Sequence, residues 1–322
     1  MEPTFPNETT PGVGGLESVS PAVAAILERL SSVVGLDRFL LFGGAAIDLI
    51  RDPGANVTDY DVAALNHPQM VRKCKRALIQ NGYEITVDER PYRIHRHVEV
   101  LLLVGKKGNE TVDVSFLGDF KDIGLFDVET LVCRYPEMVY LDAFGALDAL
   151  KRRTTLLIRR MDEEDPYVVL NRFVHVCAKY GFSMHESFVH RTLQKDLCRR
   201  LSQIMDHEYS ENRRALTSSH CSMVLRCMAT ATCRAKFLQD LGRCAWLGAT
   251  FPELKEYLAS GENRMFLERT VGKSHLVEVL LSTMNSQLLA RFEERLSYFG
   301  RRVWDADDQE IASHLELSLS KR

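Results

Sequence analysis

The chain has 322 residues and a formal net charge of −3, with 45% hydrophobic and 26% charged residues. This length accommodates two modest domains, and the composition is that of a globular protein. Because no apolar run reaches the ~18 residues of a membrane span, we expect a soluble protein without a membrane partner, cytoplasmic or else nuclear. The small net charge excludes a global attraction to nucleic acid and leaves only local patches.

The first part of the chain predicts an α/β domain with a mixed sheet. Residues 1–20 are rich in Pro, Gly, Thr and Ser and indicate a disordered tail. Alternating or β-branched runs then predict strands, and apolar residues at helical spacing predict helices. The expected helices are 21–34, 45–50 and 68–80. The expected strands are 38–42, 60–65, 83–88, 97–104 and 111–117.

The second part of the chain predicts an all-α region. After Leu125 the strand signal fades, and apolar residues recur at helical spacing. The expected helices are 141–158, 166–179, 185–205, 223–241 and 275–298. The fold class predicted is therefore α+β, with an α/β head followed by a helical region. The expected divisions are a tail (1–20), the head (21–125), a helical neck-like region (126–205), a C-terminal helical region (206–304) and a polar tail (305–322).

A pair of glycines precedes a pair of aspartates in the head. Gly43 and Gly44 stand between an expected strand and an expected helix, where backbone N–H groups and the helix dipole favour phosphate oxygens. Asp59 and Asp61 are two residues apart on the next strand and therefore share a face. Carboxylates beside a phosphate-binding turn are typical of Mg²⁺ sites for phosphoryl transfer. Alone, each signal is weak, since such pairs are mostly solvated edges or turns.

A third carboxylate would complete such a site, and two residues compete for the role. Asp113 lies between two valines on a later strand, an unusual setting for an acid without a partner. Glu99, on the strand before it, is the alternative. We favour Asp113 as the third ligand, and the choice depends on which side chain converges with Asp59 and Asp61.

At this point the sequence resembles a known family. The order Gly43, Gly44, Asp48, Asp59, Asp61 is similar to the DNA polymerase β-like nucleotidyltransferase superfamily. It resembles most of all the class II branch, which holds CCA-adding tRNA nucleotidyltransferases and bacterial poly(A) polymerases. The resemblance implies a nucleotidyltransferase head in which Asp59, Asp61 and Asp113 bind two Mg²⁺ ions. It also implies that Gly43, Gly44 and Asp48 contribute to the nucleotide site.

Two later segments resemble the same branch. The segment 140–150, YLDAFGALDAL, is similar to the branch's Asp-Pro-Phe-Gly-Gly-x-x-Asp-Leu segment, and the segment 163–182 is similar to its neck helix. The resemblance implies nucleotide contacts from Asp165 and Arg172, although Arg172 aligns only with one residue inserted and Val168 otherwise takes its place. The branch's arginine before the motif aspartate is Ile47 here.

The function implied is transfer of a nucleoside monophosphate from an NTP to an acceptor hydroxyl, with Mg²⁺ as cofactor. The resemblance favours an RNA 3′ end as acceptor. Basic pairs in the helical half could touch an RNA backbone, although we favour solvated helix faces as their explanation. A second hypothesis is a weakened or inactive member that binds nucleotide or a partner. The departures at Ile47 and Val168 favour this alternative.

Overall fold

The computed structural model of the chain describes residues 16–95, 98–118, 123–158, 166–187, 198, 211–270 and 276–299. These residues fall into two compact units. The N-terminal unit takes the chain through Lys151 and residues 157–164, and the helical unit takes residues 152–156 and the chain from Asp165 onward. No helix in the described ranges is both long and apolar enough to span a bilayer.

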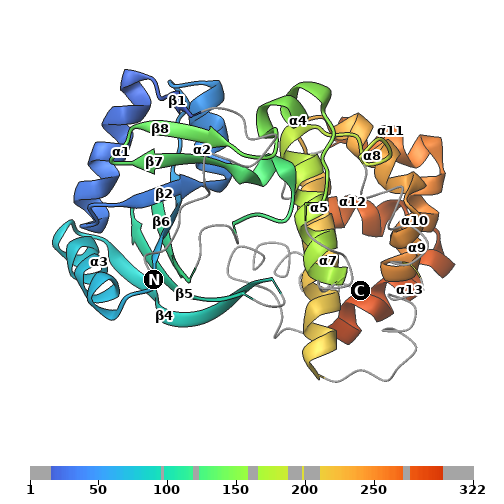
Figure 1. Cartoon of the computed structure of the whole chain (residues 1–322). Helices are drawn as coiled ribbons and strands as arrows, with labels where there is room; N and C mark the ends of the chain where they lie inside the picture. Colours follow the sequence, from blue (N-terminus) through green and yellow to red (C-terminus); the bar gives the residue numbers. More distant parts are fainter. Residues whose placement is uncertain are drawn as a thin grey trace. The chain divides into compact units, whose positions relative to one another are not determined.

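The N-terminal unit is built on one mixed sheet of eight strands (Figure 1). Its strand order is β1-β8-β7-β2-β3-β6-β5-β4. Neighbouring strands pair antiparallel except β3 with β6, which pair in parallel. The strands are β1 (Glu17–Ser18), β2 (Phe39–Phe42), β3 (Asp59–Leu65), β4 (Glu84–His95), β5 (Val98–Lys107), β6 (Glu110–Leu117), β7 (Leu131–Tyr135) and β8 (Val139–Asp142).

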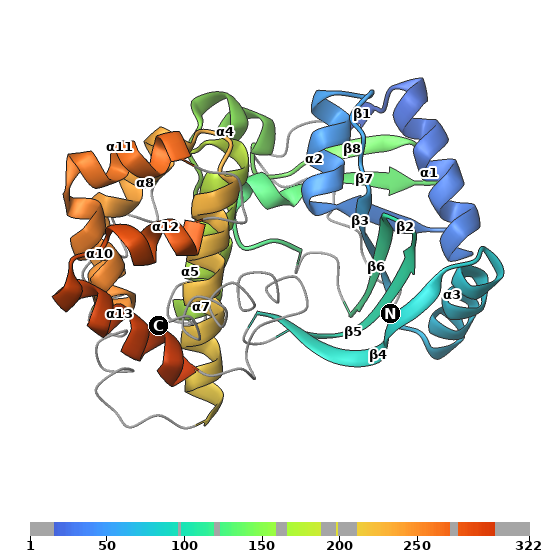
Figure 2. The same cartoon turned by 180° about the vertical axis from the view of Figure 1, so that it is seen from behind.

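Three helices cover one face of this sheet, which we call the helix-covered face. Apolar side chains of all three helices join strand residues such as Val62 and Val114 in one buried cluster. Figure 2 shows α1 and α3 next to each other beside the sheet, in line with their contacts. The helices are α1 (Pro21–Val34), α2 (Gly43–Arg51) and α3 (Pro68–Gln80). The opposite face carries a smaller apolar cluster that includes Leu40, Ala63 and Leu117.

The ends of α1 follow from its sequence. Ser20 is extended, and its hydroxyl accepts a hydrogen bond from the Val23 N–H at 3.3 Å, while proline occupies the first turn. Gly35 ends the helix in the left-handed conformation, with φ of 66°, which glycine adopts at little cost. The predicted limits 21–34 are those of the structure, and so are the limits 68–80 predicted for α3.

The helical unit contains the remaining long helices. Two of them, α5 and α7, pack against each other, and α8 packs against α10. The described helices are α5 (Pro166–Tyr180), α7 (Glu211–Thr230), α8 (Arg234–Arg243), α9 (Ala245–Thr250), α10 (Pro252–Ala259), α11 (Gly261–Thr270), α12 (Leu276–Thr283) and α13 (Ser286–Phe299). The predicted α+β class, an α/β head followed by helices, is confirmed.

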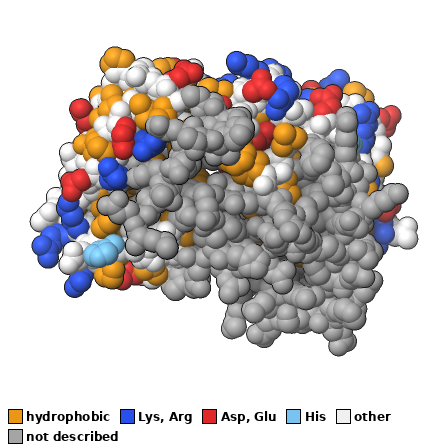
Figure 3. Space-filling model, in the orientation of Figure 1, with side chains coloured by type: hydrophobic (Ala, Val, Ile, Leu, Met, Phe, Trp, Pro, Cys, Tyr) orange, Lys and Arg blue, Asp and Glu red, His pale blue; other side chains and the backbone are white. Residues whose placement is uncertain are grey.

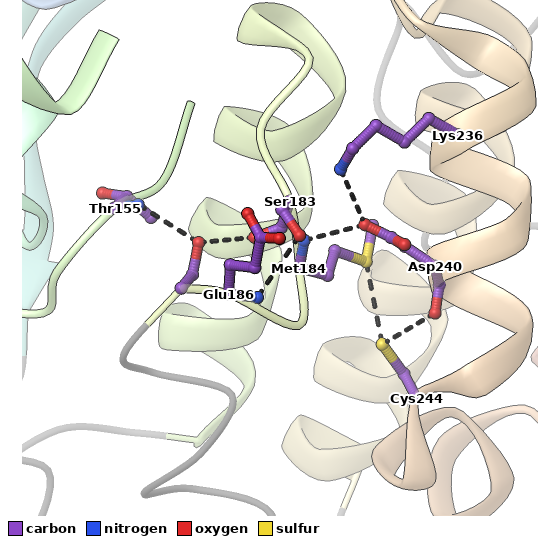
Figure 4. Close-up of polar contacts among 8 residues, drawn as sticks. Thr155, Ser183, Met184, Glu186, Lys236, Asp240 and Cys244 are labelled. Atoms are coloured by element: carbon purple, nitrogen blue, oxygen red, sulfur yellow. Dashed lines mark hydrogen bonds and ion pairs between the residues drawn. The ribbon is translucent and has the colours of Figure 1, made fainter. Parts of the chain in front are cut away.

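A buried carboxylate fixes the segment after α5 to α8 (Figure 4). Asp240 accepts hydrogen bonds from the Met184 N–H at 3.0 Å and from the Lys236 ammonium at 3.1 Å. A few residues along, the Ser187 hydroxyl accepts the Thr155 N–H at 3.1 Å. Because buried polar groups are costly without partners, these bonds hold residues 183–187 in one place within the helical unit.

The structure corrects several predicted elements. The expectation that strands end near Leu125 is wrong, because β7 and β8 form a hairpin that extends the sheet. Strands of five and four residues are too short to show clear alternation. Residues 16–18 were expected in a disordered tail, yet β1 pairs with β8 there. The rest of that tail, residues 1–15, lies outside the described ranges.

The predicted helix 141–158 is also corrected. Only α4 (Ala146–Arg152) is helical, because Asp142 still belongs to β8 and its carboxylate accepts the N–H groups of Ala146 and Leu147. The predicted helix 223–241 is interrupted between α7 and α8, and 275–298 is interrupted between α12 and α13. Most of the predicted helix 185–205 falls outside the described residues.

Candidate functional site

The site begins where β2 turns into α2. Gly43 is the first residue of α2 and has φ of 66°, a conformation that strains other residues. A Cβ added to Gly43 would lie 2.6 Å from Oδ2 of Asp61. The backbone at this turn therefore approaches the Asp61 carboxylate more closely than any side-chain-bearing residue allows. Gly44 follows as the next residue of the helix.

The start of α2 has the properties of an anion-binding helix end. Its N-cap residue is Phe42, which offers no side-chain acceptor, and its first turn contains no acidic residue. The first N–H groups of a helix have no partners within the helix, and the helix dipole adds partial positive charge there. The glycine turn thus places a positive backbone surface next to the carboxylate of Asp61.

Asp59 and Asp61 occupy the start of β3 on the same face of the sheet. Asp59 is exposed and Asp61 is partly buried, whereas Tyr60 between them is buried in the cluster of the helix-covered face. The Tyr60 hydroxyl donates a hydrogen bond to the Val57 carbonyl at 2.8 Å. This anchoring fixes the alternation of the strand, so both aspartates lie on the side of the sheet opposite Tyr60. We call this opposite side of the sheet the acid face.

Asp113 lies beside Asp61 on the neighbouring strand. In the parallel pairing of β3 with β6, Asp61 is opposite Asp113 and Asp59 is opposite Thr111. Paired residues in neighbouring strands lie about 4.8 Å apart and share a face. The valines on either side of Asp113 are fully buried in the cluster of the helix-covered face. The register therefore brings the three predicted carboxylates together on the acid face.

The electrostatics of Asp113 reflect this grouping. Burial first, and then the negative charges of Asp61 and Asp59, raise the pKa of the Asp113 carboxyl to about 7, while Lys106 opposes the rise. Its Oδ1 atom is buried and accepts no hydrogen bond from any described residue. A carboxylate in such surroundings is stabilised by a proton or by a cation.

The three carboxylates suit a hard divalent cation. Mg²⁺ prefers oxygen ligands and is held by a few carboxylates together with substrate phosphates. The unsatisfied Oδ1 of Asp113 and the mutual repulsion of the three charges are both relieved by such an ion. Among the described residues, however, no three His, Cys, Asp or Glu side chains stand in a ready-made metal-binding arrangement. In its chemistry, a set of carboxylate oxygens, the group fits the ion.

The position of Glu99 separates it from this group. In the antiparallel pairing of β5 with β6, Val104 is the residue opposite Asp113. Glu99 lies five residues along β5 from Val104, which at about 3.3 Å per residue places the two backbones about 16 Å apart. The register thus favours Asp113 over Glu99 as the third member of the group.

The other predicted nucleotide-site residues are more scattered. Asp48 lies on α2, partly buried, and Ile47 before it is buried. Arg172 is exposed on α5 in the helical unit, with Val168 one turn before it and partly buried. Asp165 lies outside the described residues. The two units are separate bodies, so the geometry of the acid face concerns the N-terminal unit alone.

Sequence reasoning missed two residues of the acid face. Lys106 of β5 pairs with Thr111 of β6, and Thr111 pairs with Asp59 of β3. Paired residues share a face. The Lys106 ammonium and the Thr111 hydroxyl therefore form a row with Asp59 across three strands of the acid face. Lys106 lies beyond the strand expected at 97–104, and β5 extends through it to Lys107. The available signal was its position across the turn from Thr111.

Comparisons with known proteins address the fold. No protein-family model and no curated protein matches the sequence. Solved structures do match. A "tRNA-processing enzyme (apo form I)" has 15% identity and a TM-score of 0.51, and the match covers 95% of the present chain and 81% of the other. A "CCA-adding enzyme with ATP" has 14% identity and a TM-score of 0.52. This match covers 95% of the present chain and 72% of the other. At these identities the likeness is one of fold: the chain shares the fold of these two structures.

Proposed function

We propose that the protein is a divalent-cation-dependent nucleotidyltransferase of the class II type, which moves a nucleoside monophosphate from an NTP to an acceptor hydroxyl. One observation carries the proposal: Asp59, Asp61 and Asp113 share the acid face on adjoining strands, beside the glycine turn at Gly43. The order of these residues along the chain and the fold of the solved relatives support the same reaction.

In this proposal each residue has a distinct task. The three aspartates hold two Mg²⁺ ions, which would neutralise the triphosphate and lower the pKa of the attacking hydroxyl. Gly43 and Gly44 let backbone N–H groups approach the triphosphate without a side chain in the way. The pKa of Asp113 is raised to about 7, so this carboxyl gains and loses its proton near neutral pH. Its protonation opposes metal binding.

The acceptor proposed is the 3′ end of an RNA, and the donor is an NTP such as ATP. The motif resemblance supports this choice. Of the two similar solved structures, one is a tRNA-processing enzyme and the other a CCA-adding enzyme in complex with ATP. Asp48, Asp165 and Arg172 are proposed to contact the nucleotide, by resemblance alone. On the side of the molecule drawn in Figure 3, the coloured Lys and Arg side chains are interspersed with Asp and Glu, so the proposed RNA contacts would be local.

The test is a transfer assay that compares the wild type with a variant lacking two of the proposed metal-binding carboxylates. Purified protein is incubated with each labelled NTP, Mg²⁺ or Mn²⁺, and total RNA, beside Asp59→Asn/Asp61→Asn. We expect labelled RNA and released pyrophosphate with the wild type and neither with the double variant. Asp37→Asn, which removes an exposed carboxylate paired with Lys73, is the control and retains full transfer. No turnover of any NTP and no metal-dependent thermal shift with NTP would contradict the proposal.

A second candidate function is a nucleotide-binding or partner-binding protein with little or no transfer. The observation that favours it is Ile47, which is buried in α2 where the resemblance expects an arginine. A buried isoleucine contributes no charge to a triphosphate. Metal-dependent binding of NTP without transfer to RNA, small molecules or protein would identify this case.

A further inference from the structure

Across the sheet, the acid face has a positive group on either side of the aspartates. The order of strands is β2, β3, β6 and β5. The N-terminus of α2 continues from β2, beside Asp61. On the other side, Lys106 of β5 stands in the row with Thr111 and Asp59. The carboxylates therefore lie between a helix N-terminus and a lysine.

The neighbouring lysine shows that this placement is specific. Lys107 points to the helix-covered face, where its ammonium donates a hydrogen bond to the Asn81 carbonyl at 2.9 Å and lies 5.6 Å from the centre of the Tyr83 ring. Lys106 is exposed. Because successive side chains of a strand alternate, it lies on the other side of the sheet, the acid face. Two adjacent lysines thus have different surroundings, one engaged in structure and one on the acid face.

The spacing allows Lys106 to act on a group bound at the aspartates. Strand spacing of about 4.8 Å puts its Cα about 5 Å from that of Thr111 and about 10 Å from that of Asp59. Asp113 lies on the diagonal, about 7–8 Å away. The flexible four-carbon side chain of lysine spans such distances and carries a compact charge suited to phosphate. The Thr111 hydroxyl adds a donor in the same row.

The geometry of the reaction decides whether Lys106 contacts a phosphate of the NTP or a phosphate of the acceptor. In phosphoryl transfer the attacking and leaving oxygens are roughly in line, on opposite sides of the phosphorus. If the leaving pyrophosphate lies at the glycine turn beside Asp61, the acceptor approaches from the side of β6 and β5. This step rests on the proposed function, which places the triphosphate at Gly43.

We propose that Lys106, with Thr111, is the acceptor-side positioning pair: it binds a phosphate of the acceptor next to the attacking hydroxyl. The acceptor is then a phosphate-bearing polymer end. The attacking hydroxyl forms the new P–O bond, pyrophosphate leaves with the electrons of the broken bond, and the hydroxyl proton passes to solvent. Lys106 takes part in neither bond change and acts on the position of the acceptor.

Adjacent single variants test the proposal. Lys106→Ala is compared with Lys107→Ala, the matched control, in the transfer assay with the RNA and the NTP varied separately. We expect Lys106→Ala to raise the RNA concentration for half-maximal transfer about five- to tenfold, the size of one charge-assisted hydrogen bond at an exposed site. Half-saturation by NTP stays unchanged. Lys106→Arg restores most of the affinity, whereas Lys107→Ala changes neither value.

A binding measurement gives a readout independent of transfer. Fluorescence anisotropy of a labelled short single-stranded RNA is followed in Mg²⁺ without NTP, over a range of salt concentrations. Loss of one phosphate contact reduces the slope of log affinity against log salt by about 0.7. We expect this decrease for Lys106→Ala and no change for Lys107→Ala.

The possible failures are distinguishable. A higher half-saturating NTP concentration in Lys106→Ala, with RNA unaffected, would place the lysine on the triphosphate side and overturn the inference while leaving the proposed function intact. Transfer to an uncharged acceptor but not to RNA would do the same, and so would equal effects of the two lysine variants. A wild type that turns over no NTP overturns both proposals.

Discussion

Replacing Asp113 with asparagine should make the metal-free protein more stable near neutral pH. The change keeps the shape of the side chain and removes one of three carboxylates that share the acid face. In the wild type, burial and the charges of Asp61 and Asp59 raise the pKa of Asp113 from its ordinary 3.8 to about 7. The ionised form is therefore unfavourable in the folded state, and asparagine removes that cost.

The sign and size of the effect follow from proton linkage. Between pH 3.8 and about 7 the folded chain keeps a proton on Asp113 that the unfolded chain has released, so the free energy of unfolding falls as the pH rises through this window. The full shift corresponds to about 4 kcal/mol. Because the carboxyl is only partly buried, we halve this for solvent screening, to about 2 kcal/mol.

The assay is denaturant unfolding in EDTA from about pH 4 to about pH 7.5. We expect equal stability of Asp113→Asn and wild type near pH 4, and an advantage of about 2 kcal/mol for the variant at the upper end. Mg²⁺ should reverse the order, because it stabilises the wild type by binding the folded state and the variant lacks a ligand. Asp37→Asn, at an exposed carboxylate, should show neither effect. A variant that is less stable than wild type at about pH 7.5 in EDTA would refute the reasoning.

Further substitutions test other features of the structure. Gly43→Ala should cost about 1–2 kcal/mol for its left-handed backbone and abolish the Mg²⁺-dependent thermal shift, because its Cβ meets Asp61 at 2.6 Å; Gly108→Ala, also left-handed but with open space around it, should lose stability alone. Asp240→Ala should cost about 2–4 kcal/mol of unfolding free energy in urea and speed amide exchange at the Met184 N–H it binds. Lys236→Ala, at a half-exposed partner, should cost less than about 1 kcal/mol. The pKa of buried His220 is lowered by burial to about 3, so stability should fall by about 1 kcal/mol for the first pH unit below 6.5. His220→Gln should flatten this acid limb, and an unchanged pH profile would contradict the reasoning.

The elements that the sequence predicts well are those whose ends are chemically marked. α1 begins at a serine cap and a proline and ends at a left-handed glycine, and α3 begins at a proline and ends before Asn81. Local signals of this kind act within a few residues, so they are legible in one sequence. The alternation of β3 likewise predicts that Asp59 and Asp61 share a face.

The features that escape prediction depend on contacts between distant segments. The sequence favours Asp113 over Glu99. Its position beside Asp61, however, depends on the register of β6 against β3 and β5, which no local pattern specifies. Lys106 joins the acid face only through that same register. The β7–β8 hairpin was missed because its short strands gain their stability from pairing with β2 and with each other, and tertiary pairing outweighs weak local preference.

The parallel pairing of β3 with β6 has a consequence for folding. It joins segments about fifty residues apart, with α3, β4 and β5 between them, and contacts of such sequence separation bear a large loop-closure cost. Asp61 and Asp113 are therefore neighbours only in a chain in which β6 has docked beside β3. The carboxylate group is thus a marker of completed assembly. During refolding, the recovery of cation affinity should trail the recovery of helical structure, and a chain arrested before β6 docks would be helical without a working acid face.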